Sequence, residues 1–406
     1  MRCGTNKHGV ECWEYVATYV DDLCIAMRDP KELLDKLQAP PFNYGIKGDG
    51  PIRFHLGCGF KQDEDGTLVW DQSRYIGRLL DSYKRHFGHE PNVPKKSAMA
   101  PLADGDHPEL DDSALLEPDD IRKYQSIIGG LQWCVTIGRF DIQAAVATMS
   151  RFAQAPRQGH MDRLHRICSY LKHFADSGIR VRTEIPDLSQ VPKIDFPWEH
   201  TVYTGAHEVL PDNAPAPLGK SVVTIHYKDA NLEHCKLTGR AMGGNFDLVN
   251  GTPIGWHGKL QTTVECASYG SESAAGRIAV DRIIDLRTRL RYLGVPIQGP
   301  SYLFGDNRAV CDAALPHSKL TKRHNALNWH RIREAIAAKI LRFIHIEGKT
   351  NPSDILSKHC GYAAGWPVIR PLLFWKGNAK DCLLPHEHVE GVTTVPAVPV
   401  NGLHSV

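Results

Sequence analysis

The chain has 406 residues, which predicts two or three domains rather than one. Its composition, with 42% hydrophobic and 23% charged residues, is typical of a globular protein, and its formal net charge of +2 means that any basic surface must come from local clustering. No apolar run approaches the roughly 20 residues of a membrane span, the N-terminus lacks the apolar core of a signal peptide, and the eleven cysteines are scattered without a C-x-x-C pair. These features predict an intracellular protein of the cytoplasm or nucleus, with no membrane contact.

The first predicted element is a β-hairpin over residues 13–27, which contains "YVDDL" at 19–23. Its apolar residues read as a buried strand, and the adjacent carboxylates Asp21 and Asp22 lie near the turn. Unpaired buried carboxylates are costly, so the pair requires a function. A helix over 29–38, with Asp29 as N-cap and Pro30 at its first position, comes next, and two strands and a helix from about 72 to 87 follow.

The composition then changes sharply over residues 101–120, which hold eight acids and no Lys or Arg. Such a segment predicts a solvated acidic linker. Residues 121–175 have a helical pattern, and the Pro-containing stretch 183–220 reads as a second linker or insertion.

The last part of the chain has the order βββαβαβα, which predicts a mixed five-stranded sheet with flanking helices. The predicted strands are 221–230, 239–250, 252–259, 301–306 and 341–348, and the predicted helices are 268–294, 324–339 and 352–359.

Four acids lie where this sheet would gather them, at strand ends and helix starts: Asp229, Glu272, Asp306 and Asp354. Converging carboxylates suit hard cations such as Mg²⁺ or Mn²⁺. Two such ions about 3.5–4 Å apart activate water and stabilise the leaving oxygen of a phosphodiester. Taken singly, each acid is better explained as a cap or turn residue, because Asp is common at such places.

Order and context favour the catalytic interpretation. Residues 221–358 resemble the ribonuclease H domain of copia-type retrotransposon polyproteins through "HYKDAN", "TPIGWHGKLQTTVECASYGSESAA", "FGDNRAV" and "NPSDILSK". The resemblance implies that the same four acids are catalytic and bind two Mg²⁺ or Mn²⁺ ions. Asn231 and Gly270 stand where the family often has further acids, and neither is one of the four metal-binding positions.

A basic stretch over residues 319–342 follows, with Glu334 as its single acid. A charge run is usually a solvated face, but beside a site that cuts nucleic acid it predicts a track for backbone phosphates. The predicted nucleic-acid contacts are Lys319, Lys322, Arg323, Arg331 and Arg333.

"YVDDL" resembles the reverse transcriptase motif, in which Tyr19, Asp21 and Asp22 would form a metal-binding polymerase turn. Later segments also resemble the copia polymerase, with Phe140 in place of the usual proline. Only 18 residues precede Tyr19, so we expect an incomplete palm without polymerase activity. The predicted parts are a palm and thumb remnant (1–100), an acidic linker (101–120), a helical connection (121–182), a linker or insertion (183–220), a ribonuclease H-like domain (221–360) and a C-terminal extension (361–406).

Three functional hypotheses follow from these patterns. The first is metal-dependent cleavage of the RNA strand of RNA–DNA hybrids, in a cytoplasmic virus-like particle or in the nucleus. The second is an inactive fragment that only binds nucleic acid, and the third is a zinc module using His359 and Cys360, which lacks ligand spacing. The sequence leaves open whether the chain pairs with a full-length polymerase subunit or with a second copy.

Overall fold

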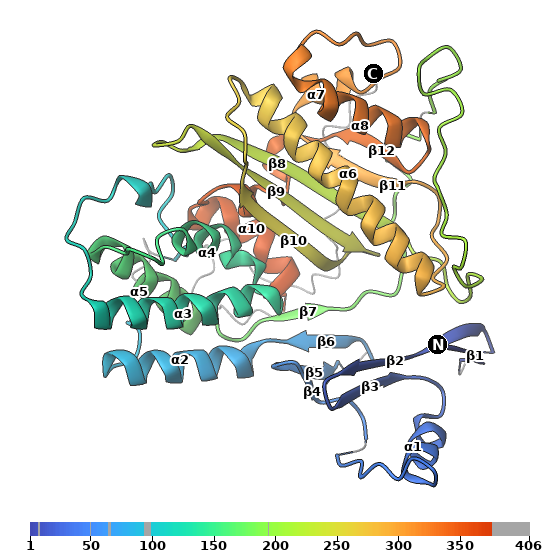
Figure 1. Cartoon of the computed structure of the whole chain (residues 1–406), viewed down its shortest axis with the longest axis horizontal. Helices are drawn as coiled ribbons and strands as arrows, with labels where there is room; N and C mark the ends of the chain where they lie inside the picture. The colour runs from blue at the N-terminus through green and yellow to red at the C-terminus, as the bar shows by residue number, and fades with distance from the viewer. Residues whose placement is uncertain (7–8, 49, 64–65, 93–98, 194, 376–406) are drawn as a thin grey trace.

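The computed structural model describes residues 1–375 except 7–8, 49, 64–65, 93–98 and 194. Its elements form an N-terminal hairpin arm, a helical unit with a small sheet, and a mixed five-stranded sheet with flanking helices (Figure 1). The prediction of a mixed sheet with flanking helices is confirmed. In the part of the chain that the structure describes, no helix combines the length and apolar character that crossing a bilayer requires.

The N-terminal arm is a three-stranded antiparallel sheet followed by one helix: β1 Arg2–Thr5, β2 Glu11–Tyr19, β3 Asp22–Ala26 and α1 Pro30–Gln38. Asp29 caps α1 as predicted, because its Oδ1 accepts hydrogen bonds from the backbone N–H groups of Lys31 and Glu32 at 3.1 and 3.4 Å. The hairpin between β2 and β3 is also confirmed. The prediction of a buried strand is wrong, because Val16 and Tyr19 are exposed.

The helical unit joins segments that the predicted boundary at residue 100 would separate. Its elements are β4 Phe54–His55, β5 Cys58–Gln62, β6 Leu68–Asp71, α2 Ser73–Phe87, α3 Pro118–Thr136, α4 Gln143–Ser150, α5 Gln158–His173 and β7 Gly178–Arg180. Strand β6 pairs with β7, more than 100 residues later in the chain. Helix α2 buries Ile76 and Tyr83 in the same core as Leu131 of α3 and Leu164 of α5. These segments therefore form one folding unit.

The acidic stretch 101–120 is not a solvated linker. Arg163 of α5 donates to the carboxylates of Asp106 and Asp111 at 2.8–2.9 Å. The side chain of Glu109 accepts a hydrogen bond of 2.8 Å from the backbone N–H of Lys236. Leu102 and Leu116 of the same stretch are buried in the core. The stretch therefore fastens the helical unit to the five-stranded sheet.

The five-stranded sheet has the order β10-β9-β8-β11-β12. Its first three strands are antiparallel neighbours, and β11 runs parallel to both β8 and β12. The elements of this part are β8 Thr224–Cys235, β9 Arg240–Val249, β10 Thr252–Leu260, α6 Ser268–Tyr292, β11 Ser301–Gly305, α7 Arg308–Ala313, α8 Ala326–Ala337, β12 Leu341–His345, α9 Asp354–Ser357 and α10 Tyr362–Leu373.

Side-chain alternation along the strands gives this sheet two apolar faces. Leu303 of β11 packs with Ile283 of α6 and Ile332 of α8 on one face. Its neighbours Tyr302 and Phe304 belong to the core that includes the helical unit on the other face. The sheet is therefore covered by α6 and α8 on one side, and by α9 and the helical unit on the other.

Phe140 explains one departure from the copia pattern. Its ring is fully buried and lies 5.0 Å from the ring of Phe246 on β9 and 5.5 Å from that of Trp256 on β10, measured between centroids. An aromatic side chain at this position fills the joint between the helical unit and the sheet.

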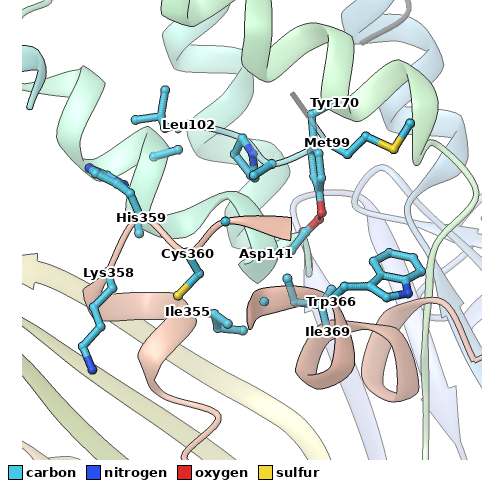
Figure 2. Close-up of a pocket in the computed structure, with 16 residues that line it drawn as sticks. Met99, Leu102, Asp141, Tyr170, Ile355, Lys358, His359, Cys360, Trp366 and Ile369 are labelled. Carbon is cyan, nitrogen blue, oxygen red and sulfur yellow. Dashed lines mark hydrogen bonds between the residues drawn. The ribbon is translucent and has the colours of Figure 1, made fainter. Parts of the chain in front are cut away.

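Helix α10 completes the same joint, so residues 361–375 belong to the core rather than to an extension. A cavity of about 30 Å³ remains between α10, α5 and the end of α9 (Figure 2). Trp366 and Ile369 line it from α10, and Met99, Leu102 and Tyr170 line it from the helical unit. Its volume admits about one or two water molecules but not a nucleotide. Residues 376–406 lie outside the described part of the chain.

Candidate functional site

Two of the predicted acids are placed side by side by strand register. Asp229 lies on β8, and Asp306 directly follows the last residue of β11. The two strands are parallel, and Gly305 pairs with Lys228. The next residue of each strand is therefore an aspartate, and both aspartates lie at the same point of the sheet.

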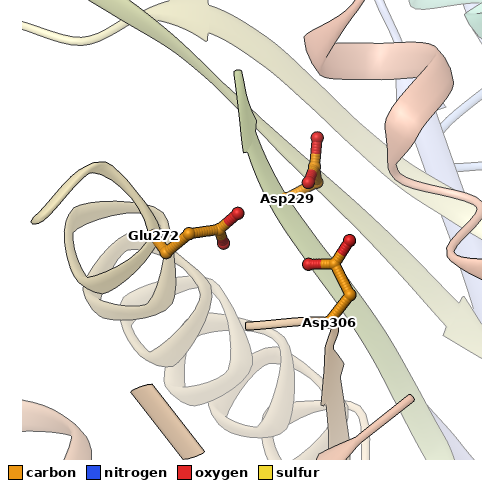
Figure 3. Close-up of side chains that lie close together, drawn as sticks. All are labelled: Asp229, Glu272 and Asp306. Carbon is orange, nitrogen blue, oxygen red and sulfur yellow. The ribbon is translucent and has the colours of Figure 1, made fainter. Parts of the chain in front are cut away.

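Glu272 completes the group from the helix above the sheet. It lies in the second turn of α6, and the residue is 5% exposed. Figure 3 shows Glu272, Asp229 and Asp306 converging from α6, β8 and the end of β11. One carboxylate oxygen from each residue lies within 4.8 Å of the others. An all-oxygen, negatively charged donor set of this kind fits Mg²⁺ or Mn²⁺.

Burial and mutual repulsion make these carboxylates costly in the metal-free protein. Burial is the largest cause that raises the pKa of Glu272 to about 6, and Asp229 and Asp306 add to the shift while Lys228 opposes it. The pKa of Asp306 is raised for the same reasons, first by burial and then by Asp229. A bound cation would relieve this repulsion.

Asp354 lies beside the group of three but is not part of it. It begins α9, on the sheet face opposite α6. Lys358 links it to the cluster, because the Lys358 ammonium lies 2.9 Å from Asp354 Oδ1 and 3.2 Å from Asp229 Oδ2. Burial, followed by Asp229, raises the pKa of Asp354 to about 7. The assignment of Asp354 as a metal ligand remains a prediction.

Three polar side chains that contact the carboxylates were not predicted from the sequence. Lys228 is fully buried and donates to Glu272 Oε2 at 2.6 Å. Burial alone would lower the pKa of Lys228, but the Glu272 carboxylate raises it above its ordinary value. Ser357 donates to Asp229, and Lys358 bridges Asp229 and Asp354. The spacing of Asp354 and Lys358, four residues apart at a helix start, was a usable signal for their ion pair.

A pH-dependent stability follows from Asp354. Because its pKa of about 7 exceeds that of a free aspartate, the folded protein binds this proton more tightly than the unfolded chain does. The resulting stabilisation is complete below about pH 4 and is lost as the pH rises through 7. In EDTA, Asp354→Asn should therefore match the wild type near pH 4 and exceed its unfolding free energy by about 1 kcal/mol or more at pH 8. Urea denaturation at several pH values measures the difference.

The control for this measurement is Asp285→Asn on α6, whose carboxylate is 58% exposed and pairs with Arg289. It removes the same charge without relieving repulsion in the cluster. A loss of stability at pH 8 in Asp354→Asn would contradict the prediction.

The polymerase motif lies apart from the carboxylate cluster. Tyr19, Asp21 and Asp22 are exposed at the turn of the hairpin between β2 and β3. The hairpin is anchored by Tyr15, whose hydroxyl donates to the carbonyl of Leu293 at 2.6 Å, just beyond the end of α6. Glu272 lies near the other end of this helix, about 30 Å away along its axis. The two acidic motifs therefore belong to separate regions (Figure 1).

The predicted phosphate track is only partly available. Arg333 is 3% exposed, donates to the carbonyls of Leu315 and Pro316, and stacks on Trp198, Tyr203 and Trp329. Its role is in packing, so including it in the track was wrong. Arg331 pairs with Asp281 at 3.0 Å and with Glu334 at 3.3 Å.

Lys319 and Arg323 are exposed. The ammonium of Lys322 lies 4.3 Å from the ring centroid of Tyr269, three residues before Glu272 on α6. These three cations therefore remain candidates for nucleic-acid contact, at the end of α6 that carries the cluster.

The zinc interpretation gains no support. The rings of His359 and His234 lie 4.9 Å apart, and both contact Thr148 Oγ1 at 3.4 Å. Across the described residues, Asp229, Glu272 and Asp306 form the only group of three potential ligands close enough to share an ion.

Comparison with known proteins connects the whole arrangement to retrotransposons. No protein-family model matches the chain. Over 347 residues, the chain is 24% identical to the "Retrovirus-related Pol polyprotein from transposon RE1" of Arabidopsis thaliana. The aligned region covers 85% of this chain and 20% of that relative. The chain matches a region of copia-type Pol polyproteins. The corresponding polyprotein from transposon TNT 1-94 of Nicotiana tabacum is 23% identical over 351 residues, covering 84% of the chain and 23% of the relative.

The chain thus spans about a fifth of the length of its curated Pol relatives. Among solved structures, ribonuclease H1 from the halophilic archaeon Halobacterium salinarum is similar over 33% of this chain and 93% of its own, with 16% identity and a TM-score of 0.26.

Proposed function

We propose that this chain is a metal-dependent nuclease that cleaves the RNA strand of RNA–DNA hybrids. The observation that carries the proposal is the convergence of Asp229, Glu272 and Asp306 within 4.8 Å of one another, from β8, α6 and the end of β11. Buried acids that repel one another are costly unless they serve a bound cation. The similarity to Pol polyproteins supports the same reaction.

Asp229, Glu272 and Asp306 would hold the Mg²⁺ or Mn²⁺, which when bound activates water and stabilises the leaving oxygen of the phosphodiester. The chain itself keeps these ligands in place. Ser357 and Lys358 both bond to Asp229 Oδ2, and the backbone N–H of Ala230 donates to Glu272 Oε1 at 3.3 Å. Asp229, fixed in this way by two side chains, needs little rearrangement during the reaction.

The hybrid would lie across the cluster and the neighbouring cations Lys319, Lys322 and Arg323. Selectivity for hybrid over double-stranded DNA would come from groove shape and contacts to 2′-hydroxyl groups. Cleavage should therefore require ribonucleotides at the cut site. The resemblance to the copia ribonuclease H domain implies 5′-phosphate and 3′-hydroxyl ends.

Hybrid binding should depend on salt through these cations. Neutralising Lys322 and Arg323 together to glutamine should lower the slope of log K against log salt by about 2, if each contacts one phosphate. The matched control neutralises Arg331 and Arg342, whose charges are already paired with Asp281 and Asp195. Binding measured between 50 and 300 mM salt tests the difference, and equal slopes for both variants would remove Lys322 and Arg323 from the binding surface.

The test of the function is cleavage of a hybrid with labelled RNA by the purified chain, in Mg²⁺ and separately in Mn²⁺. Cut RNA with an intact DNA strand supports the proposal. Bound hybrid with intact RNA in both metals would favour the alternative, a retroelement protein that binds nucleic acid without cutting it.

A further inference from the structure

Lys228 is a buried cation inside the carboxylate cluster. It directly precedes Asp229 on β8, and strand alternation turns its side chain toward α6 while Asp229 reaches Ser357 on the other face. Its side chain is 0% exposed. A lysine is almost never buried to this extent without a specific partner.

The surrounding elements form a fitted space for this side chain. A Cβ atom at Gly305 would lie 2.5 Å from Lys228 Cε, so the glycine on β11 makes room for it. The ring centroid of Phe343 on β12 lies 5.6 Å from the ammonium. The ammonium itself contacts Glu272 twice, at 2.6 Å through Oε2 and at 3.4 Å through the backbone carbonyl.

As a result, both carboxylate oxygens of Glu272 are already engaged. Oε2 accepts from Lys228, and Oε1 accepts from the N–H of Ala230 at 3.3 Å. Asp306 differs, because the described residues offer its carboxylate no ion pair and no side-chain hydrogen bond. Within one cluster, Glu272 is therefore held by an internal cation, whereas the described side chains leave Asp306 without an ion pair.

The formal charges of the cluster also indicate that Lys228 opposes the binding of a second ion. When all are ionised, Asp229, Glu272, Asp306 and Asp354 carry four negative charges, which Lys228 and Lys358 reduce to two. Lys358 is 36% exposed and can turn outward, whereas Lys228 is enclosed. One divalent cation neutralises the remaining charge, and a second must displace Lys228 from Glu272.

We propose that Lys228 is an internal competitor of the divalent cation: its ammonium holds Glu272, so that the first ion binds through Asp229 and Asp306 and Glu272 becomes a ligand only when Lys228 releases it. This inference rests on the proposed function and extends it, since it makes Lys228 the residue that sets metal affinity. It also distinguishes the two ions that the family resemblance implies, because only one of them could bind while Lys228 holds Glu272.

The test is calorimetric titration of the nucleic-acid-free protein with Mn²⁺. Lys228→Met keeps the length of the side chain and removes its charge, and it should bind Mn²⁺ about tenfold more tightly or take up a second ion. Lys259→Met is the matched control, because it removes an exposed lysine of the same sheet and should leave Mn²⁺ binding unchanged.

A double-mutant cycle separates competition for Glu272 from a general charge effect. In the Glu272→Gln background the competed carboxylate is gone, so adding Lys228→Met should change Mn²⁺ affinity by less than about threefold. The same tenfold gain in both backgrounds would overturn the proposal, because Lys228 would then act only through the field of its charge. So would a Lys228→Met protein that binds Mn²⁺ like the wild type.

A further measurement uses only the wild-type protein, so its result does not depend on whether a variant folds. The ¹⁵Nζ resonance of Lys228 should be slow to exchange in metal-free protein and should shift or broaden on saturation with Mg²⁺. A resonance that Mg²⁺ leaves unchanged would overturn the proposal.

Cleavage of the hybrid is measured in a separate assay, which distinguishes failure of the proposed function from failure of the competition by Lys228. If Lys228 behaves as described but RNA stays intact, the nuclease function fails and the competition stands. If RNA is cut while Lys228→Met binds Mn²⁺ as the wild type does, only the competition fails.

Discussion

Asp306→Asn should reduce cleavage of the RNA strand by on the order of a thousandfold or more. Asp306 is the carboxylate of the cluster that no described side chain engages, so the chain has no substitute for its charge at the metal. Because the three carboxylates would act on a shared ion, adding Asp229→Asn to this variant should lower the remaining activity little further. Single-turnover cleavage of a hybrid with labelled RNA measures both effects.

The same variant distinguishes a catalytic role from a structural one. Burial and the neighbouring Asp229 raise the pKa of Asp306, so removing its charge in EDTA should leave the unfolding free energy unchanged or raise it. Asp312→Asn, an acid on the neighbouring helix α7, is the control and should retain cleavage. A destabilised Asp306→Asn protein that still cuts RNA would show that the residue serves the fold.

The position of the acids could be predicted because it depends on local rules. Asp229 lies within β8 and Asp306 directly follows β11, and the parallel register of the two strands places them side by side. The assignment of Glu272 needed more, since a helix can place any of several residues over a sheet. Family resemblance supplied that choice, and the distance of 4.8 Å or less to the two aspartates agrees with it.

The role of Lys228 was hidden for a physical reason. In sequence, a lysine beside an aspartate on a strand reads as a solvent-facing residue on the opposite face. Only the packing of α6 over β8, and the space left by Gly305, turn that face into an enclosed site.

Neither the acidic run at 101–120 nor the basic run at 319–342 is the solvated surface that its charges predict. The acids at 106 and 111 find their partner in Arg163, and Arg331 finds Asp281, each about 50 residues away in the chain. Arg333 is covered by Trp198 and Tyr203 from the stretch predicted as a linker. Long-range pairing of this kind has no local signal, so a run of like charges does not by itself predict a solvated surface.

A second buried ion pair lies in the core of the helical unit, and breaking it should have the largest effect on stability. Arg139 is 0% exposed and donates to both carboxylate oxygens of Asp141, at 2.9 and 2.6 Å. It also donates to the carbonyl of Phe174 at the end of α5. The Tyr170 hydroxyl donates to the same Asp141 carboxylate at 2.9 Å.

Arg139→Met should therefore lower the unfolding free energy by about 3–5 kcal/mol, because it leaves a buried aspartate without its countercharge. Adding Asp141→Asn should recover part of this loss, since Tyr170 can still donate to the amide oxygen. The control is Arg122→Met, whose partner Asp119 is 76% exposed, and its cost should stay within about 1 kcal/mol. Urea denaturation at pH 7.5 measures all three, and a loss below 1 kcal/mol in Arg139→Met would mean that Asp141 is not held as a buried anion.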